Sequence, residues 1–280
     1  MNLKIHHLNC GTIRMYGGVG LFGTGGLLTP AHGVIHCLLI ETEEGLLLVD
    51  TGPGINDCTA PTPFIKMMLA LGGSRFDLQE TAYYQVEKLG YQPSDVKHIA
   101  LTHFHYDHAG GLPDFPDAKI HIFDEEYKGV IQPRDFAERT TYRPEHHAHG
   151  PDWQVHKLVG DHWFGFESTP AIDLGNLKFH FIPLPRHTAG HCGIALKLGD
   201  GWLLHCGDAY LYHGEIDIDS PSLPPYHWLF GTFFKVTKPF RAIGAHTEKL
   251  RELRRGHGHE IQFTCSHDPV EFEKFIWRLK

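Results

Sequence analysis

The chain has 280 residues, and its 33 acidic and 25 basic side chains give a formal net charge of −8. A chain of this length buries about three quarters of the surface that it exposes when unfolded, so it has room for a sizeable core. The acidic balance argues against a nucleic-acid-binding protein, which needs clustered cations. No apolar run reaches the roughly eighteen residues of a membrane span, so no membrane partner is expected.

Two further features bear on the compartment and the domain count. The first seven residues lack the long apolar segment of a signal peptide. The six cysteines form no Cys-x-x-Cys pair, which is typical of free thiols in a reducing cytoplasm. Because no internal repeat or low-complexity linker is present, we expect a single domain spanning residues 1–280.

The first third of the chain predicts paired strands. Residues 34–40 and 45–49 are apolar runs joined by a polar turn, and Asp50 follows the second run. Asp50 is either a plain turn residue before Gly52 or a partner for the N–H of a metal-bound histidine. The glycine-rich segment 17–26 lacks the ending of a phosphate-binding loop, so a hairpin or loop near the pocket is expected.

Residues 63–90 predict a helix, since apolar side chains recur on one face, and a strand then leads to residue 101. Next comes the segment from Thr102 to Gly111, with three histidines and one aspartate within six positions. His103 and His105 project to the same side at the end of an extended strand and suit one metal ion, whereas Asp107 and His108 reach a second. Imidazole and carboxylate are ligands that zinc and its neighbours accept. The alternative is a polar loop with solvated histidines.

A strand is expected at 119–123, a short helix at 124–130 and an irregular insertion at about 132–166. We expect the histidines of this insertion to be solvated or to lie at the rim of a pocket, because their spacing matches no ligand pattern. Its aromatic residues either cover an apolar substrate or anchor the loop. These are Trp153, Trp163, Phe164 and Phe166.

The remaining strands, expected at 177–182, 192–198, 201–205 and 260–265, share one feature. Histidine or aspartate beside small residues or proline follows the first, third and fourth strands. Catalytic ligands are usually gathered from several strand ends on a rigid sheet, so this recurrence outweighs the solvated-loop alternative. The residues concerned are His187, His191, Asp208 and His267.

With these motifs in order, the sequence resembles the metallo-β-lactamase-fold hydrolase superfamily over most of its length. The resemblance implies an α/β fold, the four-layer αββα sandwich, with two metal ions at one edge. It implies that His103, His105 and His187 hold one ion, that Asp107, His108 and His267 hold the other, and that Asp208 bridges both. His191 would support the site rather than bind metal. The matching motifs are Asp50-Thr51-Gly52, residues 103–108 and 185–191, Gly207-Asp208 and Ser266-His267-Asp268.

Within the superfamily, the motifs are most similar to those of quorum-quenching N-acyl homoserine lactonases. Glyoxalase II carries a further helical domain for which too few residues remain, and ribonuclease Z needs a basic surface. Those lactonases place a tyrosine three residues after the bridging aspartate, where this chain has Leu211. Tyr210 and Tyr212 flank that position, so either hydroxyl is a candidate, Tyr210 for substrate binding and Tyr212 for catalysis.

The expected activity is therefore hydrolysis of an ester or lactone in a small-molecule substrate. Two divalent ions, zinc or else manganese, iron or cobalt, would hold a hydroxide that attacks the carbonyl carbon. Asp107 would orient this nucleophile and later protonate the leaving alkoxide. Asp50 would hold a ligand histidine.

Three alternative functions and the formation of a homodimer remain open. The first alternative is a phosphodiesterase or thioesterase that uses the same ions. The second is a di-iron redox protein of this fold, whose activity would depend on oxygen. The third is a non-enzymatic metal-binding protein, which the mixed ligand set disfavours. The aromatic-rich segment 221–234, with Tyr226, Trp228 and Phe230, is expected to form a homodimer interface or to line the pocket entrance.

Overall fold

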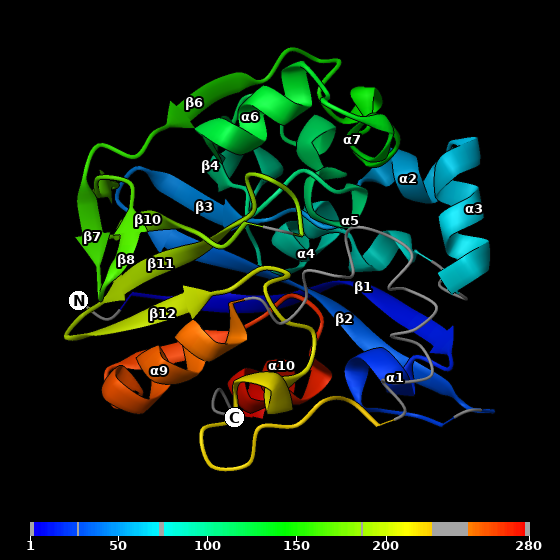
Figure 1. Cartoon of the computed structure of the whole chain (residues 1–280). Coiled ribbons are helices and arrows are strands. Elements are labelled where there is room, and N and C mark those ends of the chain that lie inside the picture. Colours follow the sequence, from blue (N-terminus) through cyan, green and yellow to red (C-terminus); the bar gives the residue numbers. More distant parts are fainter. Residues whose placement is uncertain (1–2, 27, 73–75, 186, 226–245, 278–280) are drawn as a thin grey trace.

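The computed structural model describes residues 3–26, 28–72, 76–185, 187–225 and 246–277. Two β-sheets lie against each other, with helices on the outer side of each (Figure 1). Helices α4 to α7 cover one sheet, and α9 and α10 lie beside the other (Figure 1). This order of layers is the αββα sandwich expected from the sequence.

The first sheet has six strands in sequence order. Its first three strands are antiparallel, and the pairs from β3 to β6 are parallel. Since the carboxyl ends of parallel strands meet at one edge, the loops after β3 and β4 lie together. The strands are β1 (Ile5–Tyr16), β2 (Pro30–Thr42), β3 (Gly45–Val49), β4 (Val96–Ala100), β5 (Lys119–Phe123) and β6 (Asp152–His156).

The second sheet has the order β13-β12-β11-β10-β9, and β7 and β8 form a separate two-stranded ribbon. Only the β12–β13 pair is parallel, so the loops after these two strands share an edge. The strands are β7 (Asp161–Trp163), β8 (Phe166–Ser168), β9 (Ile172–Asp173), β10 (Lys178–Pro183), β11 (Cys192–Leu198), β12 (Gly201–His205) and β13 (Ile261–Thr264).

The helices are short, and most follow a strand. On the first sheet's side are α2 (Ile55–Thr59), α3 (Pro63–Gly72), α4 (Ala82–Lys88), α5 (Tyr106–Ala109), α6 (Asp124–Ile131) and α7 (Phe136–Thr141). The other helices in the described residues are α1 (Val19–Phe22), α9 (Thr247–His257) and α10 (Pro269–Trp277). The 3₁₀ turns are η1 (Leu78–Glu80), η2 (Pro93–Asp95), η3 (Leu112–Asp114), η4 (Pro144–His146) and η5 (His213–Ile216).

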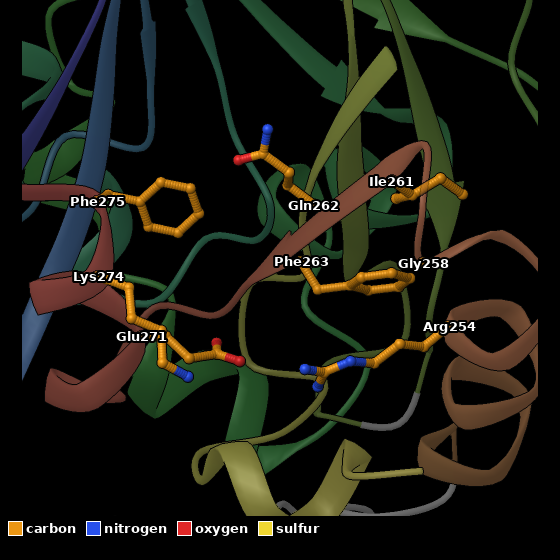
Figure 2. A pocket seen from close by; sticks show the side chains of 8 residues that line it. All are labelled: Arg254, Gly258, Ile261, Gln262, Phe263, Glu271, Lys274 and Phe275. Carbon is orange, nitrogen blue, oxygen red and sulfur yellow. The ribbon is translucent and has the colours of Figure 1, made fainter. Parts of the chain in front are cut away.

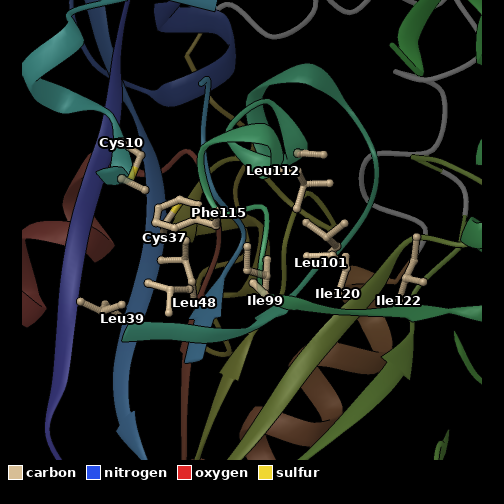
Figure 3. Packing of buried hydrophobic residues seen from close by; sticks show 14 of the residues in the cluster. Cys10, Cys37, Leu39, Leu48, Ile99, Leu101, Leu112, Phe115, Ile120 and Ile122 are labelled. Carbon is tan, nitrogen blue, oxygen red and sulfur yellow. The ribbon is translucent and has the colours of Figure 1, made fainter. Parts of the chain in front are cut away.

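The alternation of side chains along the strands explains the layers. On β2, Cys37 and Leu39 face the helices, whereas Leu38 and Ile40 face the other sheet. Both faces of this strand are therefore apolar, which is typical of a strand in the middle of a layered fold. Figure 3 shows the core beneath the helices, where Cys37 and Leu39 lie beside Leu48 and Ile99.

Three expectations differ from the structure. The helix predicted over 63–90 is divided into α3, η1 and α4. The glycine-rich segment contains the four-residue helix α1, which ends at Gly23 with φ of 70°. The insertion at 132–166 is only partly irregular, since it contains α7 and supplies β6, the edge strand of the first sheet. A short strand that pairs only on one side carries a weak apolar pattern, and this explains why the sequence did not reveal it.

Other features agree with the sequence. The strands predicted at 192–198 and 201–205 have these bounds, and all six cysteines are free thiols. Among the described helices, none combines the length and apolar character that crossing a bilayer requires. Most of the aromatic segment proposed as an interface, from residue 226 onward, lies outside the described residues, so the homodimer stays a prediction.

Candidate metal centre

The predicted ligands come from loops at one edge of the sandwich. His103 and His105 follow β4 on the first sheet, while Asp208 and His267 follow the parallel strands β12 and β13 on the second. The two sheets are joined here by the backbone N–H of Cys192, which donates to the carbonyl of Thr102 at 3.0 Å. The edge of each sheet therefore delivers its ligands to a common space.

Three histidines form the first group. A ring nitrogen of each of His103, His105 and His187 lies within 4.8 Å of the others. His187 Nε2 is 3.0 Å from His105 Nδ1, and the His103 and His187 rings meet at right angles. Three converging imidazole nitrogens are a usual ligand set for zinc.

A second group consists of Asp107, His108 and His267, whose ligand atoms also lie within 4.8 Å of one another. Asp107 and His108 lie in α5, a single turn that begins directly after His105. His267 Nε2 is 3.7 Å from Asp107 Oδ2. The compact turn explains how residues so close in sequence reach two different groups.

Asp208 lies between the two groups. Its Oδ2 is 3.3 Å from His187 Nε2, and its Oδ1 is 3.3 Å from His267 Nε2 and 3.4 Å from His108 Nε2. It also forms a possible ligand set with His103 and His108. One oxygen thus faces each predicted ion, which is the geometry that a bridging carboxylate needs.

The second nitrogen of three ligand histidines has a partner that fixes the ring. His108 Nδ1 lies 2.8 Å from Asp50 Oδ2, His267 Nδ1 lies 2.8 Å from the Val34 carbonyl, and His103 Nδ1 lies 3.1 Å from the Thr102 hydroxyl. Because a carbonyl or an ionised carboxylate only accepts, Nδ1 of His108 and His267 carries the proton. Nε2 of these two rings is then free to bind a metal ion.

Buried polar atoms without hydrogen bonds test whether the residues fit an ion. Among the described residues, His103 Nε2, His108 Nε2 and Asp208 Oδ1 have no hydrogen-bond partner, although their side chains are at most 5% exposed. Leaving a buried polar atom unpaired costs about 1–3 kcal/mol. The donor types and these unpaired atoms fit a pair of divalent ions.

Burial and the neighbouring carboxylates shift the pKa values of the site's histidines in opposite directions. Burial lowers the pKa of His105 and of His187 to about 3, which keeps both rings neutral and able to bind metal. Burial also disfavours the charged form of His108, but the carboxylates of Asp208 and Asp50 raise its pKa well above the usual value. Burial opposes ionisation of Asp208, but His267, His108 and His187 hold its pKa well below the usual value.

Asp50 and His191 support the loops of the site. Asp50 adopts φ of 54°, and its carboxylate accepts hydrogen bonds from the Thr102 N–H and hydroxyl as well as contacting His108. His191 Nδ1 donates to the Leu184 carbonyl, and its Nε2 accepts from the Asp208 N–H at 2.8 Å. Both nitrogens of His191 are therefore engaged with the backbone.

The two tyrosines differ in their surroundings. Tyr210 is fully buried and donates to Glu271 Oε2 at 2.8 Å, so the structure does not support it as a substrate contact. Tyr210 lies two positions after Asp208, and its side chain points into the core behind α10. Tyr212 is half-buried against Gly23, which follows α1. The ring centroid of Phe22, the last residue of that helix, lies 6.4 Å from the ring centroid of His267. Of the two candidate tyrosines, Tyr212 is thus the one that is not fully buried.

The insertion's histidines are not all solvated, which corrects the expectation. His146 is 2% exposed, and its Nε2 lies 3.1 Å from the buried Asp57 Oδ1. This pair ties the insertion to α2. His156 Nε2 lies 2.9 Å from His121 Nδ1 and its ring stacks on Phe181. Spacing did not reveal these roles because the partners lie far away in sequence.

Sequence reasoning also missed Glu126, a buried acid at the start of α6. Its carboxylate accepts hydrogen bonds from the Phe104 N–H, the Thr188 hydroxyl and the Gly190 N–H. Glu125 and Glu126 are adjacent and identical in type, so no sequence signal separates the exposed one from the buried one.

A cavity of about 210 Å³ lies elsewhere, between β13, α9 and α10. Figure 2 shows its lining side chains, among them Arg254, Phe263, Glu271 and Lys274. None of the predicted ligands lines this cavity. A smaller cavity of about 70 Å³ includes Asp107 in its wall.

Comparison with known proteins identifies the family of this chain. The family model of the metallo-beta-lactamase superfamily matches residues 31–255. The chain belongs to this superfamily. The matched segment includes every predicted ligand except His267, which follows it.

Two relatives and one structure are similar to this member of the superfamily. The probable metallo-hydrolase Rv2300c of Mycobacterium tuberculosis is 37% identical over 274 residues, which cover 95% of this chain and 81% of the relative. The N-acyl homoserine lactonase AttM of Rhizobium radiobacter is 26% identical, and the match covers 85% of this chain and 82% of the relative. The structure of an N-acyl homoserine lactone hydrolase with the product N-hexanoyl-L-homoserine at its catalytic metal centre shares the fold, with a TM-score of 0.68 and 18% identity. The superposition covers 98% of this chain and 97% of that chain.

Proposed function

We propose that this metallo-hydrolase cleaves an ester or lactone bond at a dinuclear metal centre. The observation that carries the proposal is the position of Asp208, whose two oxygens face the two ligand groups at 3.3 Å from His187 and from His267. A site built for one ion needs no carboxylate between two complete groups of ligands. The N-acyl homoserine lactonase relative supports the lactone as the substrate class.

The ligand sets follow from the groups. His103, His105 and His187 would hold one ion, Asp107, His108 and His267 would hold the other, and Asp208 would be shared between them. Zinc is the proposed metal, and manganese, iron or cobalt would accept the same ligands. When bound, such ions polarise a carbonyl group and lower the pKa of water to about 7.

The chain's own residues position the reactants. The Asp107 side chain is 16% exposed, so it is open to substrate on one side while its Oδ2 faces His267. We assign Asp107 to orient the attacking water, to accept its proton and then to pass that proton to the leaving alkoxide. Tyr212, beside α1, is assigned to donate a hydrogen bond to the carbonyl oxygen as that oxygen gains charge.

An apolar cavity next to Asp107 supports a substrate with a hydrocarbon part. Its volume is about 70 Å³, and it lies between the first sheet and α3. Burying one methylene group contributes about 0.8 kcal/mol, so a short hydrocarbon segment would bind here measurably. The lining residues are Ile13, Ile35, Met68, Leu69, Phe76, Tyr106 and Asp107.

The test is a substrate panel on protein of measured metal content. An N-acyl homoserine lactone, a thioester and a bis-aryl phosphodiester are compared by kcat/KM, with Asp208→Ala as the matched control. We expect the lactone to have the highest value and the control to cleave none of the three. A higher value for the phosphodiester or the thioester would assign the site to that class instead. Bound iron with an oxygen-dependent activity and no hydrolysis would replace the hydrolase proposal by a di-iron redox protein.

The six free cysteines support a cytoplasmic location, which we retain as part of the proposal.

A further inference from the structure

One buried carboxylate outside the ligand set joins the two loops that carry the first histidine group. Glu126 lies in the first turn of α6 and is 1% exposed. Its Oε1 accepts from the N–H of Phe104 at 2.7 Å, and Phe104 stands between His103 and His105. Its Oε2 accepts from the hydroxyl of Thr188 at 2.7 Å, and Thr188 directly follows His187.

The loop after His187 is also packed tightly on α6. The N–H of Gly190 donates to Glu126 Oε2 at 3.2 Å. A Cβ added at Gly190 would lie 2.0 Å from the backbone nitrogen of Glu126 and 2.6 Å from the carbonyl carbon of Glu125. Only glycine allows this approach, so the position of the His187 loop is set by the first turn of α6.

The second ligand group does not depend on this carboxylate. His108 is held by Asp50, and His267 is held by the carbonyl of Val34. None of the hydrogen bonds of Glu126 is made to Asp107, His108 or His267. Glu126 therefore contacts the part of the 103–108 loop that carries the first histidine group, whereas Asp50 contacts His108 of the second group.

We propose that Glu126 is a positioning residue for the ion held by His103, His105 and His187. Its carboxylate bridges the two loops that deliver these histidines and keeps their nitrogens converged before metal binds. The inference rests on the dinuclear centre of the proposed function, but it concerns binding of one ion and not the bond that is cleaved.

The test is metal affinity in Glu126→Gln, measured by competition with a chelating dye and by metal content at equilibrium. Glutamine keeps the shape but replaces one acceptor oxygen by an NH₂ group, which then faces the Phe104 N–H or the Thr188 and Gly190 donors. Loss of such a supporting partner typically lowers metal affinity 10–100-fold. We expect a loss of this size for one ion, an unchanged second ion, and recovery of the first at excess metal.

A matched control separates positioning from general stability. Glu215 is also a buried acid, and its Oε1 accepts from the Leu211 N–H without contacting any predicted ligand. Glu215→Gln is expected to lower the urea midpoint but to bind both ions with wild-type affinity. Thr188→Val removes one of the three hydrogen bonds and is expected to weaken one ion less than Glu126→Gln does.

Two results would overturn the proposal. One is wild-type affinity for both ions in Glu126→Gln, and the other is an equal loss of both ions. If Glu126→Gln does not fold, Thr188→Val decides, since unchanged or equally changed affinities in that variant also contradict the proposal. Because no substrate is used, a wild-type protein that binds two ions but cleaves no ester would refute the proposed function and leave this inference intact.

Discussion

At the scale of single residues, Asp208 is the predicted ligand whose two oxygens face histidines of both ligand groups. It faces His187 on one side and both His108 and His267 on the other. We therefore expect Asp208→Ala to lose bound metal and activity together, because the variant leaves histidines of both groups without their shared acid. Metal analysis after gel filtration, together with lactone turnover, measures both quantities.

The companion variant is Tyr212→Phe. Tyr212 belongs to neither ligand group, so metal content should equal that of the wild type while kcat falls, by about 10- to 1,000-fold if its hydroxyl stabilises the oxyanion. Retention of both ions and full turnover by Asp208→Ala would refute the bridging assignment. Unchanged kcat in Tyr212→Phe would refute only the role of the tyrosine.

Asp50 acts through another residue. Its carboxylate holds Nδ1 of His108 and also accepts from Thr102. Asp50→Asn keeps the size but offers an NH₂ group or a neutral oxygen to the ring, so we expect metal affinity to fall about 10- to 100-fold. Dye competition measures this loss. Gly52→Ala is not a suitable control, because φ of 67° at Gly52 would strain an alanine.

At the scale of elements, three strands of the first sheet are linked by a row of histidines. Nδ1 of His98 on β4 lies 2.9 Å from Nε2 of His121 on β5. Nδ1 of His121 in turn lies 2.9 Å from Nε2 of His156 on β6. A neutral His121 in the middle of this row donates one hydrogen bond and accepts one, and an added proton on it would bring two N–H groups face to face. Burial lowers the pKa of His121 to about 3 and that of His156 to about 4.

This row predicts a pH dependence of stability. In the unfolded chain these histidines take up protons at about pH 6.5, whereas the folded protein keeps them neutral to much lower pH. Between these values the unfolded state binds more protons, so the free energy of unfolding falls as pH falls, by up to about 1.4 kcal/mol per pH unit and histidine. His121→Gln should reduce this slope between pH 6.5 and 4.

Urea unfolding of chelator-treated protein at several pH values measures the slope. The control is His259→Gln, since the His259 side chain is 76% exposed. We expect its slope to equal that of the wild type. An unchanged slope in His121→Gln would mean that the row is not kept neutral by the fold.

At the scale of the whole molecule, the metal centre connects the two sheets. The first sheet supplies the loop of His103 to His108, and the second supplies His187, Asp208 and His267. An ion that binds only the folded state at a free concentration of a hundred times Kd stabilises it by about 2.7 kcal/mol. Removal of metal should therefore lower the free energy of unfolding by an amount of this order.

Urea unfolding with and without chelator, at several metal concentrations, measures this effect. Asp208→Ala is the control, because a variant without bound ions should not respond to chelator. Equal midpoints for metal-loaded and chelator-treated wild-type protein would show that the ions do not link the sheets in this way.

Short-range patterns in the sequence determined much of the fold and pointed to the candidate ligands. A strand of alternating or continuous apolar residues is a local property, so β2, β3, β11 and β12 were predictable. The convergence of the candidate ligands was predictable because histidine and aspartate directly follow such strands, and parallel strands bring these ends to one edge. The family's motifs then grouped His187, Asp208 and His267 with the segment from His103 to His108.

The supporting contacts were decided only by the tertiary structure. Glu126 differs from Glu125 in burial, and one of its partners, Gly190, lies more than sixty positions away. His146 meets Asp57, and Tyr210 turns towards Glu271, for reasons that no local spacing expresses. A buried polar group must find its partner wherever the fold brings one close, so these choices depend on packing between distant segments.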